Sequence, residues 1–283
     1  MSTEPGAPGP PPPVSVITSA AGRRSHLRRQ RDALVRCAPE VDHVVVDMGG
    51  RPIEDGPSRV VSLEVAAGSP LPLAAARNLG ARSARHDVLV FLDVDCVPAP
   101  GLVDRYRDLV ANEPLLWSGP VGYLPPDPEV PGWDEELLAG VARFHDGRPR
   151  PGDPASRGSD PSMFWSLSFA LDRATWDRIG GFDEAYVGYG GEDTDFARRA
   201  GRAGVELGVD GSALAFHQHH PVSSPPIEHL DDIVANATRF HDRWGEWPMA
   251  GWLSRFAADG SVDWDRAAGT LTVRERGSGA GPV

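Results

Sequence analysis

The stretch His86-Asp-Val-Leu-Val-Phe-Leu-Asp-Val-Asp-Cys-Val-Pro98 joins an apolar run to two acidic residues. The run predicts a buried strand over residues 86–95, which ends in Asp93-Val94-Asp95. Alternate residues of a strand face the same side, so the two carboxylates can converge on one site. In an open α/β sheet, ligands bind beyond the carboxyl ends of the strands, and paired carboxylates there suit a hard divalent cation. The alternative interpretation is an acidic turn without a ligand.

Strands and helices alternate on both sides of this segment. Strands are expected over residues 14–17, 41–47, 60–65, 117–123, 164–171 and 205–216. Helices are expected over residues 25–37, 73–84, 100–111, 134–145, 174–179 and 192–203. The alternation predicts an α/β fold, with a mostly parallel, Rossmann-like sheet flanked by helices.

The 283 residues divide into four parts by composition. Residues 1–13 are proline-rich and are expected to be a disordered arm, and residues 275–283 a flexible tail. Residues 14–222 are expected to form the main domain, with 223–274 as a C-terminal helical segment packed on it. An aromatic tract over 239–252 forms either an exposed apolar patch or a packed flank of that segment.

Charge and composition exclude several classes of protein. The net charge is −12 and all 28 basic residues are arginine, without a basic run, which argues against a nucleic-acid partner. Cys37 and Cys96 lack metal-ligand spacing and fit a reducing cytosol. The first residues lack the apolar core of a signal peptide, and the longest apolar stretch is too short to span a bilayer. We therefore expect a cytoplasmic protein without a transmembrane segment, and peripheral membrane contact stays open.

Three further motifs accompany the acidic pair. They are Ala76-Arg-Asn-Leu-Gly80, Gly180-Gly-Phe-Asp-Glu-Ala-Tyr-Val-Gly-Tyr-Gly-Gly-Glu-Asp-Thr-Asp-Phe-Ala-Arg-Arg199 and Ala215-Phe-His-Gln-His-His-Pro221. Together they resemble the family 2 glycosyltransferases and the catalytic region of β-1,4-galactosyltransferases, over residues 14–221. The resemblance implies the GT-A fold. It also implies inverting transfer of a sugar from a nucleotide-diphosphate sugar, such as a UDP-hexose, to an acceptor hydroxyl.

The long motif holds the residues that the resemblance places at the acceptor. Asp193 aligns with the catalytic base and Glu192 with an acid that binds the acceptor. A carboxylate within hydrogen-bond reach can take the proton of the attacking hydroxyl. The alternative is that acids in a first helical turn are simply favoured by the helix dipole, which keeps them ionised. Tyr189 and Gly191 favour an acceptor site, because flat side chains and bare backbone suit a narrow cleft.

The histidine cluster is the expected source of a metal ligand. The related enzymes supply a histidine from this region, and the His-x-x-His-Pro pattern matches His217 and His220. We expect Asp95 and His217 to bind Mn²⁺ or Mg²⁺, with Asp93 and His220 as lesser candidates and His219 as a further alternative. An imidazole beside a carboxylate and diphosphate oxygens suits manganese better than calcium.

The resemblance also places residues at the donor and under the acceptor. The donor residues are expected to be Thr18, Ala20, Arg23, Asp47, Arg77, Asp93 and Val94. Arg23 suits a phosphate, Asp47 suits the base or is only a polar strand end, and Arg77 contacts the nucleotide or supports the site. Trp165 and Ser166 are expected to contact the acceptor.

The expected partners are a nucleotide-sugar donor and a saccharide, lipid-linked or small-molecule acceptor. A nucleotidyltransferase is one alternative, since it also needs acidic metal ligands near a nucleotide. It should carry a glycine- and lysine-rich phosphate loop, and this chain has no lysine. A non-catalytic domain that binds a nucleotide sugar or carbohydrate is the other alternative, which a donor hydrolysis assay with manganese would separate.

Overall fold

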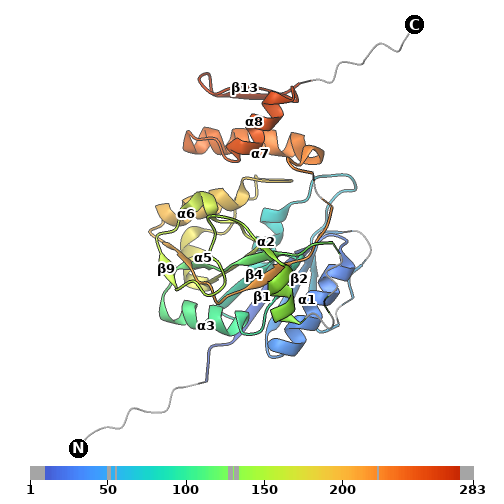
Figure 1. Ribbon diagram of the computed structural model, residues 1–283, viewed down its shortest axis with the longest axis vertical. Coiled ribbons are helices and arrows are strands. Elements are labelled where there is room, and N and C mark those ends of the chain that lie inside the picture. The colour runs from blue at the N-terminus through green and yellow to red at the C-terminus, as the bar shows by residue number, and fades with distance from the viewer. Residues whose placement is uncertain are drawn as a thin grey trace, which may run out of the picture.

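The apolar run before the acidic pair forms a central strand of an eight-stranded sheet in the computed structural model (Figure 1). The structure describes residues 10–49, 52–54, 56–126, 130, 134–221 and 223–274. The sheet has the strand order β3 (Arg59–Ser62), β2 (Asp42–Asp47), β1 (Val14–Ala20), β4 (Val88–Leu92), β10 (Ser168–Asp172), β6 (Leu116–Ser118), β11 (Leu207–Val209) and β9 (Ser156–Arg157). The predicted tail over 275–283, and residues 1–9 of the predicted arm, lie outside the described residues.

Half of this sheet is parallel, as the sequence predicted, and half is mixed. Parallel pairing joins β3, β2, β1 and β4. Strand β10 pairs antiparallel with both β4 and β6, and β9 pairs antiparallel with β11. A parallel neighbour needs a crossover connection, usually a helix. Only the short 3₁₀ helix η2 (Pro161–Met163) lies directly before β10, so this strand enters the sheet in the opposite direction.

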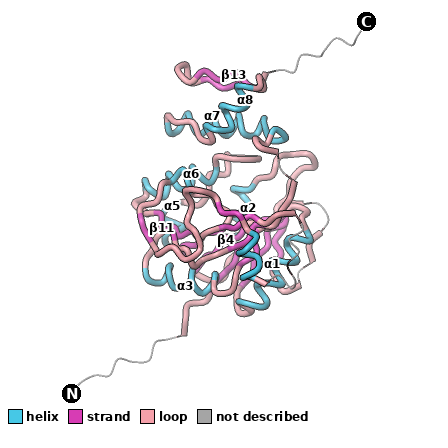
Figure 2. Tube along the Cα trace, viewed as in Figure 1, coloured by secondary structure: helices cyan, strands magenta, loops and turns pink. Residues whose placement is uncertain are grey.

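Helices cover both faces of the sheet (Figures 1 and 2). Those packed around it are α1 (Arg24–Cys37), α2 (Leu73–Ser83), α3 (Leu102–Asn112), α5 (Arg173–Ile179) and α6 (Glu192–Arg202). Alternate residues of β4 pack on opposite faces: Val90 joins the apolar cluster with α1 and α3, and Phe91 joins the cluster with α2, α5 and α6. All five residues of β4 are buried, which explains why its sequence is apolar throughout.

A second, four-stranded sheet was not expected from the sequence. Its order is β5 (Cys96–Pro98), β12 (Ala215–His217), β7 (Val121–Tyr123) and β8 (Arg143–Phe144). The single strand predicted over 117–123 is wrong, because the chain changes sheets at Gly119-Pro120. A Cβ on Gly119 would lie 1.9 Å from the carbonyl oxygen of Ala213, so the chains meet backbone to backbone there. The helix predicted over 134–145 is shorter than expected: α4 (Glu135–Val141) ends where β8 begins.

The C-terminal segment forms a separate layer above the side of the main domain on which α6 lies (Figure 1). It contains the 3₁₀ helix η3 (Ile227–His229), α7 (Leu230–Trp244), α8 (Ala250–Ala258) and the hairpin of β13 (Val262–Asp265) and β14 (Thr270–Val273). The hairpin corrects the prediction of a wholly helical segment. Its Val262 and Leu271 complete an apolar cluster with α7 and α8, so this C-terminal subdomain has a small core of its own.

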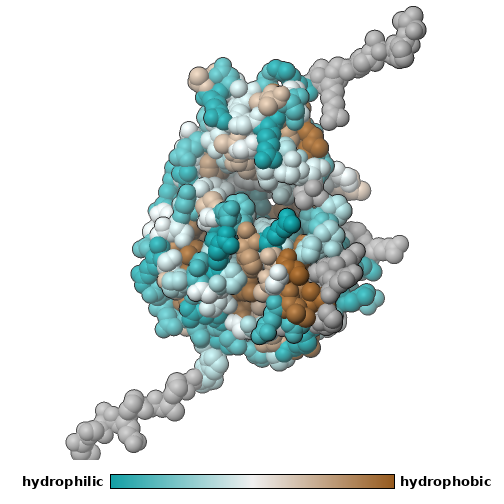
Figure 3. Space-filling model, in the orientation of Figure 1, coloured by the Kyte–Doolittle hydropathy of each residue, from teal (hydrophilic) through white to brown (hydrophobic). Residues whose placement is uncertain are grey.

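The surface and the helices of the described residues bear on the question of a membrane span. The face in Figure 3 is largely hydrophilic, with hydrophobic residues gathered over part of the main domain. Across the residues that the structure describes, no helix is both long enough and apolar enough to cross a bilayer.

Candidate active site

The two predicted metal ligands meet because two strands pair. Asp95 ends the turn between β4 and β5, and β5 pairs antiparallel with β12. In this register His217 is the partner of Cys96, the residue next to Asp95. Strand β12 also pairs with β7, which puts Tyr123 beside His217 with ring centroids 5.0 Å apart.

Asp95, His217 and His220 form a group that could hold a cation. One ligand atom of each lies within 4.8 Å of the others, and the Nε2 of His220 is 3.7 Å from a carboxylate oxygen of Asp95. Burial lowers the pKa of His217 to about 4, so its ring is neutral at physiological pH, the form that binds metals. His219 is exposed and is not part of the group. A carboxylate with two imidazoles suits a transition-metal dication better than calcium.

Helix α1 brings two further groups to the Asp95 carboxylate. Arg23, just before the helix, donates a hydrogen bond to one oxygen, and the Nδ1 of His26 contacts the other. The backbone N–H of Gln218 donates to the carbonyl oxygen of Asp95 at 2.7 Å, and its side-chain amide donates to the carbonyl of His26 at 3.1 Å. The sequence reasoning missed His26 and Gln218, since neither stands in a recognisable spacing relative to the acidic pair.

Arg77 joins the metal side of the site to the acceptor side. Its guanidinium donates to Asp93 at 3.2 Å and to Glu192 at 3.1 Å, and the residue is only 4% exposed. Burial alone would lower the pKa of Arg77, but Asp93 and Glu192 together raise it. These two hydrogen bonds support the carboxylates of Asp93 and Glu192, and a contact of Arg77 with the nucleotide stays a prediction.

Glu192 and Asp193 begin α6, as the long motif predicted. Gly191 is the residue just before the helix, and its φ of 89° is a conformation that glycine adopts readily. Among the described residues, the Oε2 atom of Glu192 is buried and makes no hydrogen bond. An unpaired buried acceptor of this kind is costly and suits a ligand hydroxyl.

Asp193 does not have the pKa that its place at a helix start suggests. Loss of water around the carboxylate, followed by the charge of Glu192, raises the pKa of Asp193 to about 7. The backbone N–H of Thr194 donates to it at 2.7 Å, which only partly offsets the rise. The raised pKa of Asp193 departs from the expectation that the helix dipole keeps both acids ionised. A carboxyl group with a pKa near neutrality suits a general base.

The other acceptor residues lie on two segments. The ring of Trp165 is half-buried, with the guanidinium of Arg148 5.0 Å from its centroid. Ser166 is buried, and the neighbouring Phe164 and Phe169 are in the core. Tyr189 is half-buried beneath the C-terminal subdomain.

Three of the predicted donor residues have side chains in the interior. Thr18 is fully buried, and its hydroxyl donates to Gln30 at 2.9 Å. Ala20 and Val94 lie in an apolar cluster with Leu27. These positions face α1 rather than solvent, because alternate residues of β1 point toward that helix. Their role in binding the donor stays a prediction, and a contact with a donor at these positions would come from the backbone.

Asp47, by contrast, lines a cavity. The cavity has a volume of about 610 Å³ and lies beyond the ends of β2 and β3, where Ser62 and Leu63 also line it. The Asp47 carboxylate accepts hydrogen bonds from the backbone N–H of Gly49 at 3.0 Å and of Ile53 at 3.3 Å. These bonds hold the carboxylate at the mouth of the cavity, where a base could reach it.

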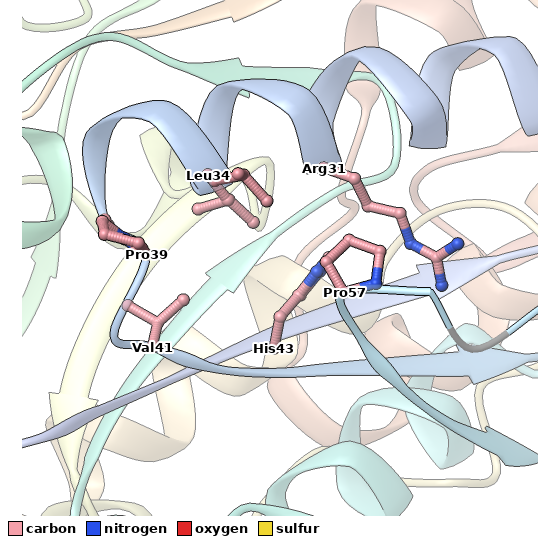
Figure 4. Close-up of a pocket in the computed structure, with 8 residues that line it drawn as sticks. Arg31, Leu34, Pro39, Val41, His43 and Pro57 are labelled. Carbon is pink, nitrogen blue, oxygen red and sulfur yellow. The ribbon is translucent and has the colours of Figure 1, made fainter.

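A smaller cavity lies between α1 and the residues at the starts of β2 and β3 (Figure 4). It measures about 90 Å³ and is lined by residues such as Arg31, Leu34, His43 and Pro57, none of which the sequence placed in the site. Burial lowers the pKa of His43 to about 3, and its ring nitrogens contact the hydroxyls of Ser58 and Thr18. This pocket is too small for a nucleotide sugar and is separate from the acidic residues.

Comparisons with known proteins agree with this geometry. Residues 68–123 match the family described as glycosyl transferase family 2, and residues 157–221 match the N-terminal domain of galactosyltransferase. A solved structure of GalNAc-T7 with UDP, GalNAc and Mn²⁺ superposes with a TM-score of 0.56 at 16% identity, covering 88% of this chain and 57% of that one. The fold is that of a GT-A glycosyltransferase. The predicted fold and resemblance are thus confirmed.

Two curated relatives are similar in sequence to more than half of the chain. A validoxylamine A glucosyltransferase of Streptomyces hygroscopicus subsp. limoneus is 29% identical over 265 residues, which is 83% of this chain and 58% of the relative. A chondroitin synthase of Escherichia coli is 28% identical over 174 residues, 53% of this chain and 25% of the relative. The chain therefore spans little more than half of the first relative's length and a quarter of the second's.

Proposed function

We propose that this chain is an inverting, metal-dependent glycosyltransferase that moves a hexose from a UDP-hexose to an acceptor hydroxyl. The observation that carries the proposal is the double ion pair of Arg77 with Asp93 and Glu192. Asp93 is two residues from Asp95, and Glu192 precedes Asp193. A donor bound on the metal side and an acceptor bound at α6 would therefore meet around one arginine.

The residues present fit a divalent cation. Asp95, His217 and His220 would hold it, and the ion, when bound, would supply positive charge to the donor diphosphate. Manganese is the first choice because of the two imidazoles, and magnesium the second. Arg23, with 39% of its side chain exposed, is placed to pair with a phosphate in exchange for Asp95.

The chain's own acids account for the transfer. The acceptor hydroxyl oxygen attacks the anomeric carbon while Asp193 takes the hydroxyl proton. The bond from that carbon to the diphosphate oxygen breaks, and its electron pair leaves with UDP. Attack opposite the leaving group inverts the anomeric centre. The unpaired Oε2 of Glu192 accepts a hydrogen bond from a second acceptor hydroxyl, which orients the first.

The cavity beside Asp47 is the proposed site for the donor base. The Asp47 carboxylate would accept a hydrogen bond from an N–H of uracil, in competition with the backbone N–H groups of Gly49 and Ile53. The acceptor is proposed to be a saccharide or a small molecule rich in hydroxyl groups. The validoxylamine A glucosyltransferase, which acts by name on a small acceptor, supports this choice over a lipid-linked one.

The test is a screen of UDP-glucose, UDP-galactose and their N-acetyl derivatives, with and without Mn²⁺, in which released UDP is measured. We expect slow hydrolysis of at least one donor with Mn²⁺ and none with an Asp193→Asn variant. Thermal stabilisation by a donor without any UDP release would indicate a non-catalytic domain. Release of diphosphate from a nucleoside triphosphate and a sugar phosphate would indicate a nucleotidyltransferase instead. Either of these two results would overturn the proposal.

A further inference from the structure

The C-terminal subdomain contacts the glycine-rich segment 187–191, which leads into the catalytic acids. Asn236 of α7 is only 3% exposed, and its side-chain amide donates to the carbonyl oxygens of Val187 at 3.0 Å and Tyr189 at 3.3 Å. Both amide hydrogens are thus used to hold one short stretch of backbone. Since Glu192 follows this stretch directly, its position depends on a helix that lies outside the GT-A sheet.

Two glycines of the segment pack directly against the same subdomain. A Cβ on Gly188 would lie 2.2 Å from the carboxylate carbon of Asp232, and one on Gly190 would lie 2.6 Å from the sulfur of Met249. Both glycines also have positive φ angles, of 79° and 90°. The segment therefore has no room for side chains at these positions, and α7 and the start of α8 cover its backbone.

The one large side chain of the segment is also held by the subdomain. The Tyr189 ring stacks on His229, with centroids 4.9 Å apart and planes 10° apart, and lies 5.9 Å from Trp252. All three rings are half-buried, so they form one aromatic surface at the border between the two parts of the molecule. Aromatic rings with exposed portions suit contact with the apolar face of a sugar ring.

A buried acid beyond the segment completes the attachment. Asp195 is fully buried in α6, and one of its oxygens accepts from Arg243 and from the indole N–H of Trp244, both at 2.9 Å. Helix α7 therefore holds the chain on both sides of the catalytic acids. It binds the backbone of the segment before Glu192, and it binds the carboxylate of Asp195, which follows Asp193.

We propose that the acceptor site is shared between the main domain and the C-terminal subdomain, with Asn236 as the residue that positions Tyr189 and Glu192. His229 and Trp252 extend the Tyr189 surface toward the part of a saccharide acceptor that lies beyond the reacting hydroxyl. The inference rests on the proposed glycosyltransferase function. It gives the aromatic tract over 239–252 a role in acceptor selection, through Trp252 and Trp244.

The test compares Asn236→Ala with Thr238→Ala, a control on the same helix whose hydroxyl bonds only to Val234 among the described residues. The probes are UDP-glucose, or the donor found by the screen, and a panel of p-nitrophenyl monosaccharides and disaccharides. We expect Asn236→Ala to raise the acceptor KM about tenfold, which corresponds to about 1.4 kcal/mol of lost binding. Donor affinity should stay within about twofold of the native value, because the residues placed at the donor keep their contacts, and Thr238→Ala should leave donor hydrolysis unchanged. Hydrogen exchange of the amides in 187–191 should quicken in Asn236→Ala and not in Thr238→Ala.

Trp252→Leu provides a second variant at a half-buried position, where loss of the native fold is not expected. It should raise the KM of disaccharides more than that of monosaccharides. A native acceptor KM in both variants would overturn the inference, and so would an equal fall of donor hydrolysis, transfer and melting temperature, which indicates a merely structural role. If the native chain hydrolyses no donor, the proposed function fails. Unchanged hydrogen exchange of residues 187–191 in Asn236→Ala would separately contradict the positioning role of Asn236.

Discussion

The carboxylates of Asp95 and Asp193 have opposite kinds of neighbours. Asp95 faces Arg23, His26 and His220, all of which are or can be cationic. Asp193 is next to another carboxylate, Glu192, and its pKa is raised to about 7. The first environment suits a carboxylate that shares permanent charge with a cation and a diphosphate. The second suits a group that takes up and releases a proton near neutral pH. The two environments thus suit the two roles proposed for these carboxylates, charge compensation at Asp95 and proton transfer at Asp193.

The largest effect should come from removing the proton acceptor. Asp193→Asn keeps the size of the side chain but removes its basicity, and should lower turnover by about a hundredfold or more. Donor and metal affinity should stay near native, because these ligands bind at the other carboxylate. The measurements are turnover and donor affinity by calorimetry. Glu192→Gln is the matched variant, and should act mainly through the acceptor KM. Near-native turnover of Asp193→Asn would refute the assignment.

The next effect concerns the cation side. His217→Ala removes one of the two imidazoles that converge with Asp95 and should weaken Mn²⁺ binding at least about tenfold. His219→Ala is the control, since that ring is exposed and outside the group. Manganese titration of donor hydrolysis checks both variants. Equal manganese affinity in the two would show that His217 is not a ligand.

The pH dependence should distinguish the two carboxylates directly. A general base acts in its ionised form, and the ionised fraction of Asp193 falls as the pH drops through about 7. At saturating Mn²⁺, kcat/KM should therefore fall about tenfold per pH unit on the acid side of the profile. In Asp193→Asn this fall of kcat/KM on the acid side should become shallower, and only the part of the fall that is due to metal binding should remain. An unchanged limb in that variant would assign the titration to another group.

The smallest effect should appear at the far end of the donor site. Asp47→Asn removes one charged acceptor beside the 610 Å³ cavity and should raise the donor KM about fivefold, roughly the value of one hydrogen bond. The change should be larger for UDP-glucose than for ADP-glucose, because only one base matches the native carboxylate. Kinetics with both donors, at fixed acceptor, check this. An equal rise for both donors would mean that Asp47 acts on the loop that it braces.

The sequence predicted the chemistry of the site better than its internal contacts. Two motifs can be recognised from short stretches of sequence alone. One is the apolar strand that ends in Asp-x-Asp, and the other is the histidine cluster after a later strand. Their meeting depends on the pairing of β5 with β12, in a sheet that the sequence did not indicate. The ion pairs of Arg77 likewise join residues 16 and 115 positions away, and no local pattern encodes such distances.

The C-terminal hairpin shows a signal that was present but overlooked. Val262-Asp-Trp-Asp265 and Thr270-Leu-Thr-Val273 both alternate in polarity, which is typical of strands with one buried face. The helical pattern before them was extended too far. Thr18 shows what the sequence does not contain. Its place near a strand end suggested a donor contact, but the direction of its side chain depends on how α1 packs on the sheet.

The pairing of β5 with β12 also couples the cation to folding. Asp95 and His217 lie far apart along the chain and meet only when the second sheet has formed. An ion that bridges them binds the native chain in preference to the denatured ensemble, and so adds free energy of unfolding that grows with its concentration. At a hundred times its dissociation constant, this linkage amounts to about 2.7 kcal/mol. Chelators would then lower the denaturation midpoint, a change that can be followed without an activity assay.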